Sequence, residues 1–123
     1  MKDFSGLWSK AMAAGMAAGN AVSPVPMVVT QADIFGKPIP GAVRHFVSEG
    51  CCGFAWVVVR PGNSPFANWG KKQKLLSPNY GGGVKYWVGE FGQSMARKEA
   101  FADAMAKVLS EAGIKAYADS RMD

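Results

Sequence analysis

The sequence predicts an α+β or α/β fold, a two-layer sandwich of a sheet with four or five strands and two or three helices. The first observation is the run 50–60, GCCGFAWVVVR, which is uncharged up to its final arginine and rich in β-branched and aromatic residues, as strands are. The second is the order strand, helix, strand, helix, strand that begins there. The third is size, since 123 residues with 49% hydrophobic content can bury one core. We therefore expect one domain over 1–123, with its sheet-and-helix core at 26–118.

The run 50–60 has two apolar faces, because successive side chains of a strand alternate. We expect a central strand covered on both sides, with Trp56 buried and the small face open to close approach by another element. The larger face carries Cys52, Phe54, Trp56 and Val58, and the smaller one carries Cys51, Ala55, Val57 and Val59.

An N-terminal helix is expected over 4–19, where apolar residues recur at helical spacing. Small residues at Ala11, Gly15 and Gly19 form a smooth stripe on it. Such a stripe lets the helix lie close on a sheet or on a second copy of itself, so a homo-oligomer through this helix is one expectation. Short strands are predicted at 26–30 and 42–47, with a turn at GKPIPG between them.

Two further helices follow the central run. Ser64 and Pro65 form a strong helix start, a side-chain cap followed by proline at the first position. Ser94 caps the longest helix, which ends at Gly113. The segment 84–91 is a strand between them, and 114–118 is a final strand before a polar tail.

Several motifs resemble those of small uncharacterised proteins of tailed bacteriophages and marine metagenomes. They are a GxxxG-like N-terminal helix, PMVV, CGFAWV, PGNSPFANW, a glycine-rich turn before a tryptophan-containing strand, QS, and AGIKAYADSRMD, which together span nearly the whole chain. The resemblance implies a phage-like origin and action inside a bacterial host. It assigns no site residue.

The loops that precede the two capped helices form a candidate anion site. If their strands are parallel neighbours, both loops emerge at the carboxyl edge of the sheet, where ligands of such sheets bind. Free helix N–H groups suit phosphate, and basic residues in a first helical turn oppose the helix dipole unless an anion lies nearby. The candidate residues are Arg60, Gly62, Asn63, Ser64, Gln93, Ser94, Arg97 and Lys98.

A nucleic-acid surface is a second candidate, because the net charge is +5 and the chain is rich in aromatic residues. Trp87 and Lys85 share a strand face near Tyr80 and could stack bases and contact phosphates. The alternative is that these aromatic residues belong to the core. The basic residues of this surface are Lys71, Lys72, Lys74 and Lys85.

Catalytic and metal chemistry have little support in the sequence. His45 with Glu49 and Cys51 suggests a Cys/His pair, but a surface histidine is the more common explanation. One histidine and two divergent cysteines do not supply a zinc site, no P-loop or dinucleotide motif is present, and no cofactor is expected. Adjacent Cys51 and Cys52 are expected to be reduced, buried thiols in a cytosolic protein.

The sequence favours a small non-enzymatic protein in the cytoplasm that binds an anionic partner such as nucleic acid. The first alternative is an oligomeric protein of phage assembly or host modulation. The second is an enzyme acting on a phosphorylated small molecule, which needs a pocket at the helix starts with Glu90 or Glu99 facing into it. No membrane partner is expected, because no segment has the apolar length to cross a bilayer.

Overall fold

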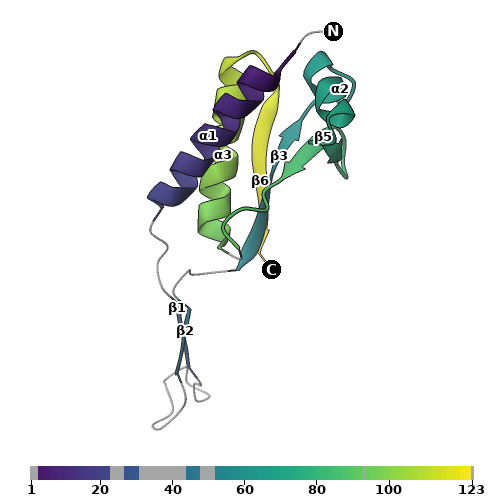
Figure 1. Ribbon diagram of the computed structural model, residues 1–123. Helices are drawn as coiled ribbons and strands as arrows, with labels where there is room; N and C mark the ends of the chain where they lie inside the picture. Colours follow the sequence, from purple (N-terminus) through teal and green to yellow (C-terminus); the bar gives the residue numbers. More distant parts are fainter. Residues whose placement is uncertain (1–2, 23–26, 31–43, 48–51, 93, 123) are drawn as a thin grey trace.

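The protein has an α+β fold in which helices pack against a four-stranded antiparallel sheet (Figure 1). The structure, a computed structural model, describes residues 3–22, 27–30, 44–47, 52–92 and 94–122. The predicted two-layer arrangement is confirmed. The elements in chain order are α1 Ser5–Ala21, β1 Met27–Thr30, β2 Arg44–Val47, β3 Gly53–Val59, α2 Pro65–Lys72, β4 Ser77–Pro78, β5 Val84–Trp87, α3 Met95–Glu111 and β6 Ala116–Met122.

The main sheet has the strand order β4-β5-β3-β6, and every neighbouring pair is antiparallel. The central position predicted for the run 50–60 is confirmed, since β3 lies between β5 and β6. Within the described residues, strands β1 and β2 pair with each other and form a two-stranded sheet apart from the main one. The turn expected at GKPIPG lies outside the described residues.

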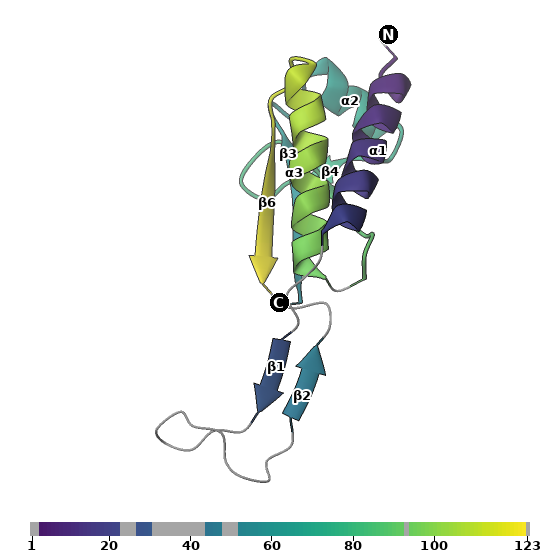
Figure 2. The ribbon, with the colours of Figure 1, turned by 90° about the vertical axis from the view of Figure 1, so that its left-hand side faces the viewer.

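The two faces of the sheet differ from the expectation. The face of Ala55, Val57 and Val59 is covered by the helices, and Figure 2 shows α1 and α3 side by side on it. No described helix lies over the face that carries Phe54 and Trp56, although the Lys98 ammonium of α3 comes within 5.4 Å of the ring centroid of Phe54 at one end. Trp56 is therefore half-buried rather than buried, and the expectation of cover on both sides is wrong.

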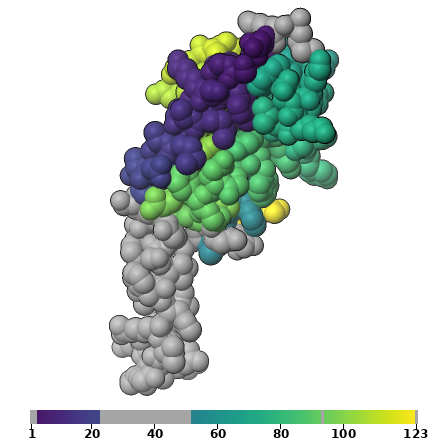
Figure 3. Space-filling model, viewed as in Figure 1, coloured from purple at the N-terminus to yellow at the C-terminus, as the bar shows by residue number. Residues whose placement is uncertain are grey.

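The core on the helix side is built largely by aromatic residues of the helices. Phe4 and Trp8 of the N-terminal segment contact Phe66 and Trp69 of α2, with ring centroids 5.3–6.3 Å apart. Figure 3 shows α1 seated on the body with α2 at its N-terminal end. Because these rings fill the space above the sheet, the strand beneath them needs only small side chains.

The stripe of small residues on α1 is buried inside this chain. A methyl group added at Gly15 would lie 2.8 Å from the ring of Phe101, and one at Gly19 would meet the ring of Phe91. Ala11 is fully buried as well. The stripe thus lets α1 approach α3 and its neighbours, and it offers no exposed apolar surface for a second copy.

Two strand boundaries differ from those predicted. β5 ends at Trp87 instead of Phe91, and the chain then turns through left-handed conformations at Phe91 and Gly92. Phe91 then packs on Phe101 at the helix side, and not on the face of Lys85 and Trp87. β6 continues to Met122 through the segment expected to be a polar tail, since it pairs with the whole length of β3.

Candidate functional site

The uncovered face of the sheet carries a row of large aromatic and charged side chains. The antiparallel register places Trp87 of β5 and Asp119 of β6 on either side of Trp56. One step along, Lys85 and Tyr117 flank Val58 in the same way. We call this surface the open face; its residues are Phe54, Trp56, Val58, Lys85, Trp87, Tyr117, Asp119 and Arg121.

The centre of the open face is a parallel stack of two indole rings. Trp56 and Trp87 have ring centroids 5.4 Å apart and an interplanar angle of 6°. Phe54 continues the aromatic surface with its ring centroid 5.3 Å from that of Trp87. Trp87 is 41% exposed and Tyr117 is 42% exposed. Large aromatic side chains so exposed are typical of binding surfaces.

Cationic side chains lie over these rings. The Lys85 ammonium is 5.5 Å from the centroid of Trp87, and the Arg121 guanidinium carbon is 5.7 Å from that of Phe54. Arg60, just beyond β3, lies 5.5 Å from the ring of Tyr117. Charges held this way stay in water beside the aromatic surface and remain able to meet an anion.

These groups line a hollow of about 520 Å³, which is large enough for a nucleotide-sized ligand. Three of its lining side chains are cationic and one is a carboxylate. The lining residues are Trp56, Arg60, Asn79, Tyr80, Lys85, Trp87, Tyr117, Asp119, Ser120 and Arg121.

The glycine-rich turn between β4 and β5 shapes one end of the hollow. Gly81, Gly82 and Gly83 all have φ between +78° and +114°, a region that other residues adopt at a cost. A side chain at Gly83 would strike the carbonyl of Val59, so glycine allows the turn to approach the end of β3. Arg60 then donates a hydrogen bond to the Gly81 carbonyl at 3.1 Å, and Tyr80 stands fully exposed at the tip.

The structure does not bring the predicted anion-binding loops together. Because β3 and β5 are antiparallel, the Ser64 loop and the Ser94 loop follow strands that run in opposite directions and leave opposite ends of the sheet. The shared site required parallel neighbours, and that premise is wrong. Both serines do cap their helices, accepting from the amides of Ala67 at 3.2 Å and Arg97 at 3.4 Å. Gln93 lies outside the described residues.

The basic residues at the start of α3 have partners within the protein. The Arg97 guanidinium donates to the carbonyl of Gly19 at 3.1 Å, near the C-terminal end of α1, where a cation is favourable. The Lys98 ammonium is buried and lies 3.4 Å from the carbonyl of Gly53. Their positions in a first helical turn are therefore explained without a bound anion. Of the other predicted residues, Gly62 and Asn63 lie in the Ser64 loop, and Arg60 lines the hollow.

The predicted nucleic-acid surface divides into two parts. Lys85 lines the hollow, whereas Lys71, Lys72 and Lys74 are exposed at the end of α2 and do not line it. Lys71 and Lys72 occupy the last turn of that helix, which suits their charge. Two residues of the open face are absent from the predicted surface. Arg121 falls in the segment expected to be a polar tail, and Tyr117 falls in the predicted strand 114–118, whose place beside the central strand the sequence does not give. The alternation of AYADSRM is the signal that puts both on one face of a longer strand.

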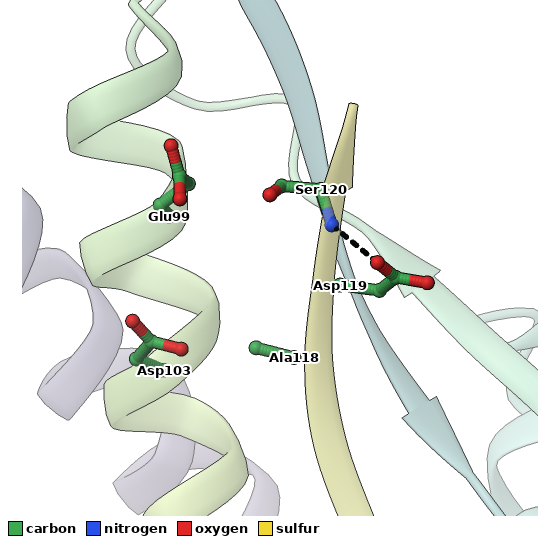
Figure 4. Close-up of a pocket in the computed structure, with 5 residues that line it drawn as sticks. All are labelled: Glu99, Asp103, Ala118, Asp119 and Ser120. Atoms are coloured by element: carbon green, nitrogen blue, oxygen red, sulfur yellow. Dashed lines mark hydrogen bonds between the residues drawn. The ribbon is translucent and has the colours of Figure 1, made fainter. Parts of the chain in front are cut away.

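The pocket that the enzyme alternative requires would have Glu90 or Glu99 facing into it at a helix start. Glu90 accepts from the Tyr86 hydroxyl at 3.0 Å, and burial together with this carboxylate raises the pKa of Tyr86 above its usual range. Glu99 lies with Asp103 along the other side of β6 (Figure 4). Neither lines the hollow of about 330 Å³ beside Ser64. Among the residues placed in the structure, no three His, Cys, Asp or Glu side chains gather to hold a metal ion.

The structure describes only some of the residues in the hypotheses about the cysteines and the histidine. Cys52 is a free thiol and is exposed, so the expectation that it is buried is wrong. Cys51 and Glu49 lie outside the described residues, and His45 pairs with Val29 in the small sheet. Over the parts of the chain that can be described, no helix combines the length and apolar character needed to cross a bilayer.

No family model, no curated protein and no solved structure matches this chain. The function is therefore inferred from the residues of the open face.

Proposed function

We propose that the protein binds single-stranded nucleic acid on the open face and performs no chemistry on it. The observation that carries this proposal is the parallel stack of Trp56 and Trp87 in a hollow rimmed by three cations. Base-to-aromatic stacking combined with a basic groove is the common way in which proteins hold single strands. In a duplex the base faces are already stacked on one another, so the exposed ring of Trp87 favours the single strand.

The cations supply contacts to the phosphates. Lys85 lies over the ring of Trp87 and Arg121 over that of Phe54, so a base on the aromatic surface would bring its phosphates within their reach. Arg60 holds the third position, beside Tyr117. The net charge of +5 adds long-range attraction for a polyanion. The proposal retains the cytoplasmic location and phage-like origin predicted from the sequence, since single-stranded nucleic acid is available inside a bacterial host.

Fluorescence anisotropy with labelled oligonucleotides tests the proposal. We expect the single strand to bind more tightly than the same sequence as a duplex, and Trp87→Ala to lower the affinity for the single strand by about 1–3 kcal/mol. Trp87→Phe, which keeps an aromatic ring, should retain most of the affinity. Absence of binding to any oligonucleotide at low salt would remove nucleic acid as the partner.

A further inference from the structure

One side chain of the open face does not fit a surface built only for phosphate. Asp119 lies directly across from Trp56 and lines the same hollow. Figure 4 shows its carboxylate on the side of β6 turned away from α3, whereas the side chain of Ser120 faces α3. A carboxylate at this position repels phosphate, so its contribution must concern another part of the ligand.

The carboxylate of Asp119 retains capacity to accept hydrogen bonds. Its Oδ1 accepts from the backbone amide of Ser120 at 2.8 Å, which fixes the side chain next to the strand. Among the described residues this is the one hydrogen bond that the carboxylate makes, and each carboxylate oxygen can accept two. The group is thus oriented and still open to a donor from a ligand.

The four bases differ in what they offer to such an acceptor. The Watson–Crick edge, which is free in a single strand, carries two adjacent N–H donors in guanine, matching the two oxygens of a carboxylate. Adenine and cytosine present one amino group beside an unprotonated ring nitrogen, whose lone pair repels the carboxylate. Uracil and thymine present one imino group between two carbonyl oxygens. Guanine is therefore the base that this geometry favours.

We infer that Asp119 makes the hollow selective for guanine, with the base stacked on the Trp56–Trp87 surface and its Watson–Crick edge turned toward β6. This inference rests on the proposed binding of single strands and adds the base that is preferred. A carboxylate directly across the strand from a stacking ring is placed to meet the edge of a base on that ring.

The experiment uses the full chain and labelled oligothymidines of one length. They carry two central guanines, adenines, cytosines or thymines, a design that avoids guanine quadruplexes. We expect the guanine strand to bind on the order of tenfold more tightly than the all-thymine strand. Asp119→Asn should abolish this preference, because an amide keeps only one acceptor, while binding to the all-thymine strand stays equal or improves.

Asp103→Asn is the matched control, since it removes the same charge from an exposed position on α3, on the other side of β6 (Figure 4). It should leave the guanine preference unchanged. Equal binding of all four strands by the unaltered protein, or a guanine preference that survives in Asp119→Asn, would overturn the inference and leave the proposed function standing. Absence of binding to every strand would overturn both. Matching thermal unfolding of the two variants verifies that each is folded.

Discussion

The four tryptophans form two pairs on opposite sides of one sheet. Trp8 and Trp69, on the helix side, are 9% and 6% exposed, and their rings meet at 54° among other aromatic residues. Trp56 and Trp87, on the open face, stack at 6° beside cations and are partly in water. Tilted, enclosed rings are typical of a packed core, whereas a flat, accessible stack offers its face to a ligand. The difference separates residues that hold the fold from residues available for binding.

The largest expected difference between the helix side and the open face is the loss of unfolding free energy when an aromatic side chain is truncated. Phe101 is fully buried against Tyr86 and Phe91, so Phe101→Ala should lower the free energy of unfolding by about 3–5 kcal/mol. Trp87→Ala should cost only about 1–2 kcal/mol, because its ring is already 41% exposed and loses mainly its stack. Urea denaturation measures both. Equal losses would show that the open face is as much a core as the helix side.

The helix side should also be intolerant of added volume. Gly15→Ala gains about 1 kcal/mol of helix propensity, but its methyl group would lie 2.8 Å from the rigid ring of Phe101. We expect a net loss of about 1–2 kcal/mol, as is usual for overpacked cores. Gly6→Ala, in the same helix, is the matched control, since the added methyl group meets nothing within 4 Å beyond its chain neighbours and the nearby backbone of its own helix. It should be neutral or stabilising by a few tenths of a kcal/mol to about 1 kcal/mol.

The elements of this fold could be predicted from the sequence because their signals are local. Ser64 with Pro65, and Ser94, mark helix starts by groups that they satisfy within one turn, and both caps are present. The run 50–60 shows its strand character in its own composition. Its two apolar faces predict a central position in the sheet, and β3 does lie between two other strands.

What could not be predicted depends on contacts between distant segments. The sequence predicts cover on both faces of β3, with Trp56 buried. In the structure Phe66 and Phe101 of the helices fill the core, and the small face of β3 lies beneath them. Strand direction also depends on how the connections return, and the antiparallel pairing of β3 with β5 separates the two helix starts. Of the residues that line the hollow, the sequence predicts Trp87, Lys85 and Tyr80 as a stacking surface and Arg60 as an anion contact. It does not place Trp56 or Arg121 beside them, because these come from β3 and β6.

Cations of the open face should contribute to binding of a single strand, whereas cations at the end of α2 should not. Replacing Lys85 and Arg121 with Gln removes two cations of the open face, and each lost phosphate contact should flatten the salt dependence of single-strand affinity by about 0.7 in log–log slope. Lys71→Gln with Lys72→Gln removes the same charge from the end of α2, outside the hollow. Its slope should stay close to that of the unaltered protein. If the salt slope of this control fell as much as that of the open-face variant, the lysines of α2 would also contact the nucleic acid.

The smallest effect is expected at the exposed thiol. Cys52 is exposed and forms an isolated backbone bridge with Ser94, so Cys52→Ala should change the free energy of unfolding by less than about 0.5 kcal/mol. Binding of oligonucleotides should be unchanged. In the native protein Cys52 should react readily with a thiol reagent. If Cys52→Ala abolished activity without altering stability, a nucleophilic role of the thiol would gain support over simple binding.

Intrinsic tryptophan fluorescence tests most directly whether the open face is the binding face. An unlabelled single strand should quench the emission of Trp56 and Trp87 as bases stack on them, while buried Trp8 and Trp69 keep theirs. The double variant Trp56→Phe with Trp87→Phe retains only the buried pair, so it should still bind by anisotropy and show no quenching. Quenching that persists in this variant, or binding by the unaltered protein without any quenching, would contradict the assignment of the open face.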